Sequence, residues 1–482
     1  MTQPNILWIC SDQQRYDTLG CTGNPWVRTP NLDRLASCGV LFDRCYTQSP
    51  VCTPSRAGFL TGRYPRTTRC RQNGQSIPAD EVLVPKVLSD AGYVCGLSGK
   101  LHLSPCHPRA CRAMERRIDD GYAVFHWSHH PAREERAASW PGNEYGAWLK
   151  EQNAAFERKP FRGSRYVRQG PPEALHQTTW CVQKAITFIE RAAAYGEPWL
   201  FSVNMFDPHH AFDPPAALLE RYAHVLDDIP LPAFREGELA GKSRFQRMDH
   251  RGAYNNPRGM AYDDMTESDH RLVRAAYWAM VDLIDRQVGR LLTTLETSGQ
   301  LENTVVIFTS DHGEMLGDHG IYLKGPHFYE PAVRVPLIVA GPGVQEPGRR
   351  TGALVELDDL APTVLDLAGV DRPAGMQARS LLDVLEGGDA HRADVYCEYY
   401  NAMPWHRDPE AHATMVRTDR HKLVVYHGIG EGELYDLTAD PGETRNLWNE
   451  PAAAGAKTDM LVRLCDRMAW TVDPLPEREG DW

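Results

Sequence analysis

Cys52 and Arg56 stand in the segment CTPSRAGFLTG in an arrangement suited to binding an anion. Thr53 is a residue type that caps helices and Pro54 suits a first helical turn, so we expect a short helix that ends near the last glycine of this segment. Cys52 would lie just outside its N-terminus, where unpaired amides and the helix dipole favour negative charge, and Arg56 adds a cation about one turn later. The alternative is that Cys52 is a small buried hydrophobic residue, as many cysteines are.

Metal-ligand residue types follow two apolar, strand-like runs. Asp12 and Gln13 come shortly after NILWIC, and Asp311 and His312 come directly after TVVIFTS. Two carboxylates, an imidazole and an amide oxygen suit a divalent ion: carboxylates favour Ca²⁺ or Mg²⁺, whereas the imidazole also admits Mn²⁺ or another transition metal. A single aspartate after a strand is usually only a turn or cap residue. Two such clusters favour a metal site, whose ion the sequence leaves open.

Cationic and imidazole side chains follow other strand-like runs. Lys100 and His102 come after YVCGLS, His209 comes after PWLFSVNMF, and Lys324 lies beyond the second aspartate cluster. The lysines, with Arg56, could neutralise a bound tetrahedral anion, and the histidines could move protons. Any one of them alone would more often be a surface charge or a structural histidine. Their common position after strands favours a shared site.

These residues need a scaffold that brings several strand ends together. Short apolar runs occur at residues 5–10, 93–98, 198–206, 304–310 and 335–341, and helical patterns occur at 31–37, 81–91, 175–194, 267–297 and 358–367. Buried strands that alternate with helices predict an α/β fold with a large, mostly parallel mixed sheet sandwiched by helices. Such sheets bind ligands at the carboxyl ends of their strands.

The pattern changes at about residue 385. The runs ADVYCEYY, ATMVRT, HKLVVY and GELYDL are strand-like, and a helical pattern follows at about 453–466. They predict a smaller C-terminal α+β domain with an antiparallel sheet and a helix. We therefore expect a catalytic domain over residues 1–384 and a second domain over 385–482. Residues 105–170 favour a surface loop or active-site lid, although their tract HWSHHP could also bind metal.

Composition excludes several classes of protein. Of the 482 residues, 42% are hydrophobic and 24% charged, which is typical of a globular protein. A formal charge of −12 argues against a general nucleic-acid or polybasic membrane-surface protein. The N-terminus shows no basic and apolar leader pattern, so we expect a soluble, cytoplasmic protein without a membrane partner. Most of its 12 cysteines should then be free thiols.

The segment CTPSR, followed by LTG, resembles the C-x-P-S-R signature of type I, formylglycine-dependent sulfatases of the alkaline phosphatase superfamily. Further motifs resemble those of the family in the same order: NILWICSDQQ, SGKLHL, DPHHAFDPP, FTSDHGEMLGDHG, KGPHFYEPAVRVPLIV and GELYDLTADPGETRNL. The resemblance covers most of the chain. It implies that a formylglycine-generating enzyme converts Cys52 to formylglycine, whose hydrated aldehyde is the nucleophile.

The resemblance also implies a role for each matched residue. The implied metal ligands are Asp12, Asp311, His312 and the modified Cys52, with Gln13 as a further candidate. Among the implied catalytic and substrate-binding side chains, Arg56 supports the formylglycine, and Lys100 and Lys324 hold the sulfate. His102 hydrogen-bonds the gem-diol and helps to break the intermediate, and His209 protonates the leaving alcohol. Asn73 is the implied polar substrate contact.

The implied activity is that of an arylsulfatase-like sulfuric ester hydrolase. It would cleave a small-molecule or saccharide sulfate ester in two steps, through a covalent sulfo-enzyme intermediate on the metal-bound nucleophile. The long segments 105–170 and 216–266 are expected to form the walls of the pocket. Insertions of this kind can also mediate self-association, so a homo-oligomer is possible.

Two departures from the family pattern keep alternatives open. Many sulfatases have two aspartates where this chain has Asp12-Gln13, and Asp-Asn where it has Asp311-His312. Both changes weaken an assignment of calcium. The resulting residues resemble those of the phosphonate monoester and phosphodiester hydrolase branch of the superfamily, so that activity is the main alternative to sulfatase activity. A non-catalytic binding protein that keeps Cys52 as a thiol is another. A protease-like thiolate hydrolase is a third, although it would not need the metal cluster.

Overall fold

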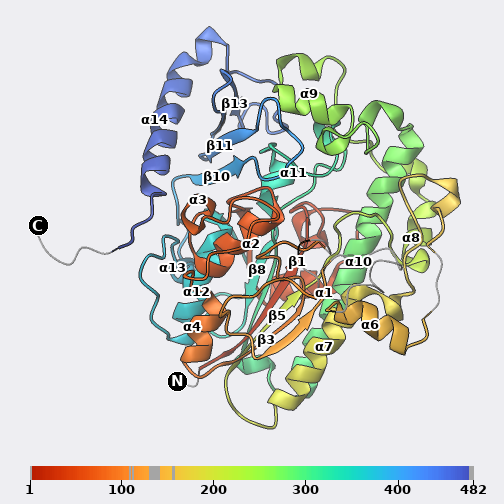
Figure 1. Cartoon of the computed structure of the whole chain (residues 1–482), viewed down its shortest axis with the longest axis vertical. Helices are drawn as coiled ribbons and strands as arrows, with labels where there is room; N and C mark the ends of the chain where they lie inside the picture. The colour runs from red at the N-terminus through yellow and green to blue at the C-terminus, as the bar shows by residue number, and fades with distance from the viewer. Residues whose placement is uncertain (1–2, 108–109, 111–112, 130–141, 155–157, 477–482) are drawn as a thin grey trace, which may run out of the picture.

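A nine-stranded mixed sheet runs through the larger part of the molecule, with helices on both faces (Figure 1). The computed structural model describes residues 3–107, 110, 113–129, 142–154 and 158–476. The strand order is β4 (Val124–Trp127), β3 (Val94–Gly99), β5 (Trp199–Asn204), β1 (Asn5–Ser11), β6 (Thr304–Ser310), β8 (Leu337–Ala340), β2 (Gly39–Tyr46) and β7 (Arg334–Val335), with β9 (Arg349–Glu356) also paired to β2. The first five strands in this order are parallel, whereas β8 runs antiparallel to both β6 and β2. The predicted mostly parallel mixed sheet is confirmed.

Helices cover both faces of the central strands, which explains why these strands are continuous apolar runs. Every residue of β1, β5 and β6 is buried. Ile6 and Trp8 of β1 pack into the core beneath α2 (Cys52–Thr61), α4 (Val84–Asp90) and α12 (Leu360–Ala368). Leu7 and Ile9 point the other way, into the core beneath α1 (Pro30–Ser37), α7 (Gln177–Ala192) and α10 (Glu267–Thr297). Alternate side chains of β1 therefore belong to two different hydrophobic cores, one on each face of the sheet.

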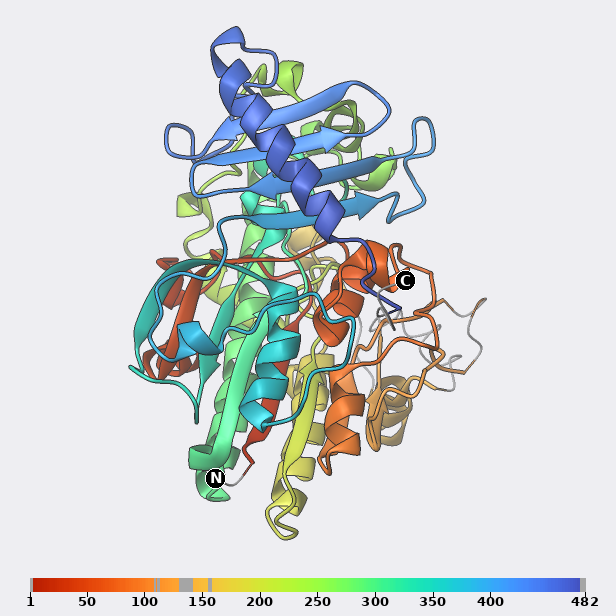
Figure 2. The ribbon, with the colours of Figure 1, turned by 90° about the vertical axis from the view of Figure 1, so that its left-hand side faces the viewer.

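A second sheet of four antiparallel strands lies beside the first (Figure 2). Its strands are β10 (Val395–Tyr400), β11 (His412–Arg417), β12 (His421–Tyr426) and β13 (Glu431–Asp436). The helix α14 (Ala454–Trp470) crosses one face of this sheet and buries Met460 and Leu464 against it. The predicted C-terminal antiparallel sheet with one helix is confirmed.

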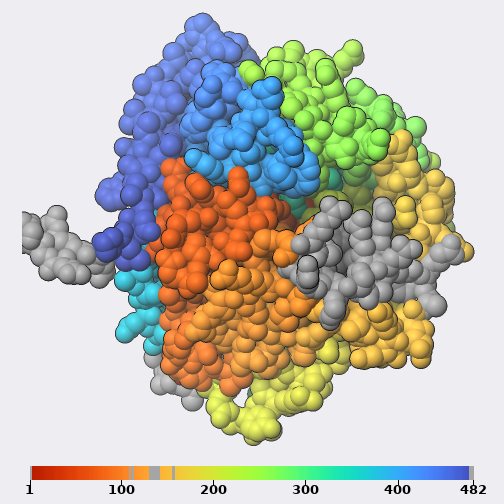
Figure 3. All heavy atoms as spheres, viewed as in Figure 1, coloured from red at the N-terminus to blue at the C-terminus, as the bar shows by residue number. Residues whose placement is uncertain are grey.

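The two sheets share buried side chains. Val51 and Phe328 belong to one apolar cluster with Val395 and Met415 of the second sheet. In the space-filling view, the blue C-terminal part lies directly against the orange-red segment that carries α2 and α3 (Pro65–Thr68) (Figure 3). The division into domains at residues 384 and 385 stays a prediction.

Several elements were not expected from local patterns. They include β2, β4, β7, β9 and the shorter helices α6 (Glu144–Glu151), α8 (Ala216–Ala223), α9 (Arg244–His250), α11 (Glu330–Val333) and α13 (Leu382–Leu385). The segment 105–170 contains β4 and α6, but parts of it, including the last histidine and the proline of HWSHHP, lie outside the described residues. None of the helices within the described ranges is long and apolar enough to cross a membrane. All cysteines in these ranges are free thiols, as expected.

Candidate active site

Cys52 is the first residue of α2, one position further into the helix than its sequence suggests. The N-cap residue is Val51, and Thr53, the expected cap, lies in the first turn. The backbone N–H of Thr53 donates to Oδ1 of Asn73 over 3.0 Å, so a side chain from a later loop satisfies this end of the helix. The expected start at Thr53 is therefore wrong, because a tertiary contact replaces the local cap. Asn73 thus lies in the site, and its role as a substrate contact stays a prediction.

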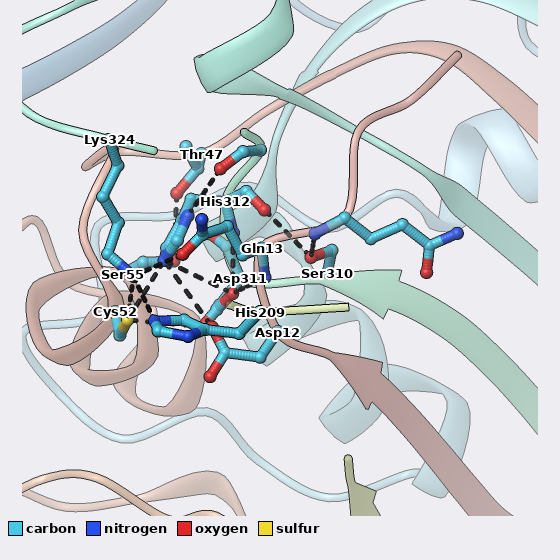
Figure 4. Close-up of polar contacts among 12 residues, drawn as sticks. Asp12, Gln13, Thr47, Cys52, Ser55, His209, Ser310, Asp311, His312 and Lys324 are labelled. Atoms are coloured by element: carbon cyan, nitrogen blue, oxygen red, sulfur yellow. Dashed lines mark hydrogen bonds and ion pairs between the residues drawn. The ribbon is translucent and has the colours of Figure 1, made fainter. Parts of the chain in front are cut away.

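The four side chains expected at a metal site come together (Figure 4). Ligand atoms of Asp12, Cys52, Asp311 and His312 all lie within 4.8 Å of one another, and all four residues are buried. Asp12 and Asp311 meet because they follow β1 and β6, which are parallel neighbours in the sheet. Two carboxylates, a sulfur and an imidazole this close together could hold a divalent ion.

The imidazole of His312 is oriented as a metal ligand. Its Nδ1–H donates to the carbonyl oxygen of Gly313 over 2.9 Å, which directs Nε2 toward the cluster. Nε2 lies 3.1 Å from Sγ of Cys52, 3.8 Å from Oδ1 of Asp12 and 3.7 Å from Oδ1 of Asp311. The tautomer is thus fixed by a backbone contact outside the cluster.

Electrostatics also fit a cation. Burial, with the nearby Asp311 and Cys52, raises the pKa of Asp12 to about 6. Two carboxylates and a sulfur in one dry site disfavour one another's negative charge, and a divalent cation would relieve that repulsion. The donor set is therefore complementary to a positive ion.

Gln13 occupies a different place from the expected fourth ligand. Its side-chain oxygen accepts a hydrogen bond of 2.6 Å from Nζ of Lys324, and its Nε2 donates to Glu314. Glu314 also accepts hydrogen bonds from the backbone N–H groups of Leu316 and Leu323. Gln13 therefore links Glu314 to Lys324 in this structure, and metal ligation by Gln13 stays a prediction.

Lysines flank position 52. Nζ of Lys324 lies 3.2 Å from Sγ of Cys52, and the ammonium of Lys100 pairs with Asp12. Burial alone would raise the pKa of the Cys52 thiol, but Lys100, Lys324 and His312 outweigh it and hold this pKa well below its usual range. The site therefore stabilises negative charge at position 52, as the sequence predicts.

The guanidinium of Arg56 is fully buried beside the metal cluster. Its Nε donates to Oδ2 of Asp311 and its Nη1 donates to the carbonyl oxygen of Lys100, both over 2.9 Å. Nη2 has no hydrogen-bond partner among the described residues. A buried donor without an acceptor is costly, so this N–H group is available for a hydrogen bond to a further acceptor.

The two histidines expected to move protons are both neutral in this structure. Burial and the adjacent Lys324 hold the pKa of His209 well below its usual range, and burial with Lys100 lowers that of His102 to about 4. His209 donates from Nδ1 to the carbonyl oxygen of His210 over 2.5 Å, while its Nε2 accepts from Lys324 over 2.8 Å. The ring of His210 stacks on His209, with centroids 4.1 Å apart. His209 thus contacts the cationic side of the site through Lys324.

Some residues that shape the site had no assigned role in the sequence. Ser55 donates to the carbonyl oxygen of Asp311 over 2.6 Å and so ties α2 to the end of β6. Glu314 holds the loop that ends at Lys324, and Glu115 accepts the backbone N–H of His102 over 2.9 Å. Glu314 lies inside the motif FTSDHGEMLGDHG, which was a clue to its importance. Glu115 has no comparable local pattern, because its role comes from a tertiary contact.

Two family models match the chain. Residues 4–370 match the sulfatase family, and residues 317–469 match a model described as N-sulphoglucosamine sulphohydrolase, C-terminal. The two matches together cover both sheets.

Individual relatives extend over nearly the whole chain. An arylsulfatase of Clostridium perfringens (strain 13 / Type A) is 30% identical over 458 residues, which cover 93% of this chain and 90% of that protein. An N-acetylglucosamine-6-O-sulfatase of Bacteroides thetaiotaomicron is 27% identical and covers 96% of this chain, with 86% of its own length matched. The solved structure of a phosphonate monoester hydrolase from Silicibacter pomeroyi superposes with a TM-score of 0.83 at 27% identity, over 98% of this chain and 96% of that one.

Proposed function

The chain belongs to the sulfatase family, and on that premise we propose that it hydrolyses a sulfate monoester with a nucleophile made from Cys52. The observation that carries the proposal is the convergence of Cys52 with Asp12, Asp311 and His312 within 4.8 Å at the end of the sheet. A thiolate enzyme of the protease type would not need a cluster of metal-ligand residues beside its nucleophile.

We propose two groups that the protein acquires during maturation. One is formylglycine, formed from Cys52 by a formylglycine-generating enzyme, and the other is a divalent ion, Ca²⁺ or Mn²⁺, held by Asp12, Asp311 and His312, with Gln13 as the further candidate. The hydrated aldehyde would supply an oxygen nucleophile, and the ion would lower its pKa and polarise the sulfate.

Lysines and histidines would then handle the substrate. Lys100 and Lys324 bind the sulfate oxygens, because their ammonium groups flank position 52. Lys324 also donates to Nε2 of His209, so a proton source stands beside the imidazole that we assign to the leaving alcohol. His102, which is neutral and contacts Cys52, serves as the base that removes a proton at position 52 in the second step.

The names of the relatives support a substrate class. The relatives include an arylsulfatase and an N-acetylglucosamine-6-O-sulfatase, so we propose a sulfated saccharide or aryl alcohol as the substrate. A measurement on the nucleophile tests the chemistry first. Tryptic digestion yields one peptide, residues 45–56, which contains both Cys45 and Cys52.

We expect aldehyde-trapping mass spectrometry to find an aldehyde at Cys52 and a thiol at Cys45, in protein made by a host that performs the conversion. The same protein should hydrolyse 4-nitrophenyl sulfate, and the Cys52→Ser variant should lose multiple turnover. A fully active enzyme with a thiol at position 52 would overturn the proposal.

A second candidate function has one specific observation in its favour. The chain superposes well on a phosphonate monoester hydrolase, and Asp12-Gln13 with Asp311-His312 departs from the common sulfatase pattern. Comparing kcat/KM for matched aryl sulfate and aryl phosphonate esters decides between the two. A preference for the phosphonate would replace sulfate as the substrate while keeping the nucleophile.

A further inference from the structure

A pocket of about 330 Å³ lies beside the proposed catalytic residues. His210 and Leu323, which are the chain neighbours of His209 and Lys324, both line it. This volume is within the range of ligand-binding pockets and exceeds what a sulfate group alone would need. Because His209 is the residue that we assign to the leaving alcohol, the pocket lies where the alcohol portion of a substrate would extend.

The charged side chains that line this pocket are both arginines. Among the residues that the structure describes, Arg165 and Arg258 line it and no carboxylate does, although the whole chain carries a formal charge of −12. Neither guanidinium has an ion-pair partner among the described residues. Arg165 instead lies over the ring of Tyr166, 4.9 Å from its centroid. Two arginines that have no ion-pair partner among the described residues attract an anionic group more strongly together than either would alone.

An aromatic pair stands beside the pocket. The ring of Tyr254 stacks on that of Trp405, with centroids 4.6 Å apart and planes at 23°, and lies 6.0 Å from the ring of His210. Tyr254 and Asn255 adopt left-handed φ angles of 62° and 50°, a backbone conformation that is uncommon for residues other than glycine. Nδ2 of Asn255 donates to the carbonyl oxygen of Trp405 over 3.4 Å and helps to hold this loop. A flat aromatic face next to cations suits a charged sugar ring.

We propose that this pocket binds the alcohol portion of the substrate and that Arg165 and Arg258 recognise a second anionic group on it. The preferred substrates are then acidic saccharides that carry a carboxylate or a second sulfate in addition to the sulfate that is cleaved. This inference rests on the proposed function, because it assigns the specificity of the same site.

Matched substrates test it through kcat/KM. One pair is an N-sulfated and an N-acetylated hexosamine with the same O-sulfate, and the other is a sulfated glucuronic acid and the equally sulfated glucose. We expect the acidic member of at least one pair to be preferred by roughly tenfold or more, because hydrogen bonds between charged groups are stronger than those between neutral groups. The pair with the larger preference tells whether the second anion is a sulfate or a carboxylate.

Variants assign the preference to the two arginines. Arg258→Ala and Arg165→Ala should each reduce the acidic-to-neutral ratio of kcat/KM, mainly through KM, and Arg258→Lys should retain part of it. The KM of the acidic substrate should rise with ionic strength more steeply than that of the neutral one. Arg445→Ala, at an exposed arginine that does not line the pocket, should leave the ratio unchanged. Equal kcat/KM values within both pairs, or a ratio that the pocket variants do not alter, would overturn the inference.

Failure of the proposed function gives a different result. If 4-nitrophenyl sulfate is not hydrolysed by protein with an aldehyde at position 52, the sulfatase chemistry is wrong whatever the pocket binds. Calorimetric titration of the Cys52→Ala protein with the N-sulfated hexosamine sulfate tests the pocket without turnover. Binding that is weakened by Arg258→Ala supports the inference, and binding equal to that of the N-acetylated partner contradicts it.

Discussion

Single side chains at this site act through the charges around them. Cys52 is buried, which disfavours a thiolate, yet Lys100 and Lys324 reverse that effect and lower its pKa. Lys324 also donates to His209 and to Gln13, so one ammonium touches three functional groups. The chemistry therefore depends on the position of this lysine more than on any intrinsic reactivity of its neighbours.

The role of His209 depends on the leaving group. His209→Gln should reduce kcat/KM for alkyl and saccharide sulfates by about 10²–10⁴, because general acid catalysis typically contributes that factor. The loss should be much smaller for 4-nitrophenyl sulfate, whose phenol leaves readily without a proton. Steady-state kinetics across a series of leaving groups measures this. An equal loss for every leaving group would assign His209 to binding instead.

Removal of the metal tests the ligand cluster. Dialysis against a chelator should abolish turnover of 4-nitrophenyl sulfate and lower Tm, because Asp12 and Asp311 would then face each other without a cation. Restoring Mn²⁺ or Ca²⁺ singly, with both activity and Tm as readouts, identifies the ion. Asp311→Ala should remove the metal-dependent rise in Tm. Full activity after the chelator has removed all bound metal would contradict metal dependence.

At the scale of elements, a buried carboxylate joins three segments that surround the site. Asp318 accepts from Nη1 of Arg15, which follows β1, over 2.7 Å and from Nη2 of Arg274, in α10, over 2.9 Å. It also accepts the backbone N–H of Ala233 over 2.8 Å. Burial alone would raise the pKa of Asp318, but Arg15 and Arg274 outweigh it and hold this pKa at about 2.

This contact makes stability depend on pH. Because the folded-state pKa lies below the unfolded value of about 3.9, the contribution is present above pH 4 and is lost as the pH falls through about 2. Asp318→Asn should therefore lower the free energy of unfolding by about 2–3 kcal/mol at pH 7. The difference between the two proteins should shrink between pH 4 and pH 2. Denaturant unfolding at several pH values measures it, and a difference that does not depend on pH would rule out this account.

The sequence predicts the elements that have a strong local pattern. Apolar runs identify β1, β5 and β6, and α10 matches its expected bounds of 267–297. In contrast, β2 and β9 were not recognised, because their identity as strands depends on mutual pairing far along the chain. The convergence of Asp12 with Asp311 was predictable, since ends of neighbouring parallel strands meet. The capping of α2 by Asn73 was not, because no local pattern encodes a contact between a helix and a distant loop.

At the scale of the whole molecule, the second sheet supports the loop that carries Lys324. Lys422 of β12 is fully buried and pairs with Glu330 and Glu443, each over 2.7 Å. Its Nζ also donates to the carbonyl oxygen of Phe328 over 2.9 Å. This ammonium group thus joins the segment from Lys324 to α11 to the C-terminal sheet, together with the hydroxyl of Tyr426, which donates to the carbonyl oxygen of Pro326 over 3.2 Å.

Loss of that ammonium should damage the whole molecule. Lys422→Met would remove the ion-pair partner of the buried Glu443 and leave Glu330 with only the longer contacts to Arg334 and Arg417, so it should lower the free energy of unfolding by about 3–5 kcal/mol, with a parallel loss of activity. Urea denaturation measures this, and Arg445→Ala, at an exposed pair, is the matched control. Retention of wild-type stability by Lys422→Met would show that this ammonium is not needed to hold the two sheets together.

The burial of α2 has a consequence for when the protein matures. All ten residues of this helix are buried, and the side chain of Cys52 is only 1% exposed. An oxidising enzyme cannot reach the sulfur once the helix has docked, so the conversion proposed here competes in time with the collapse of the chain around it. Newly made chains that fold early would be trapped as unconverted protein, and only unfolding would return them to the modifying enzyme. Folding speed would then set the fraction of molecules that become active.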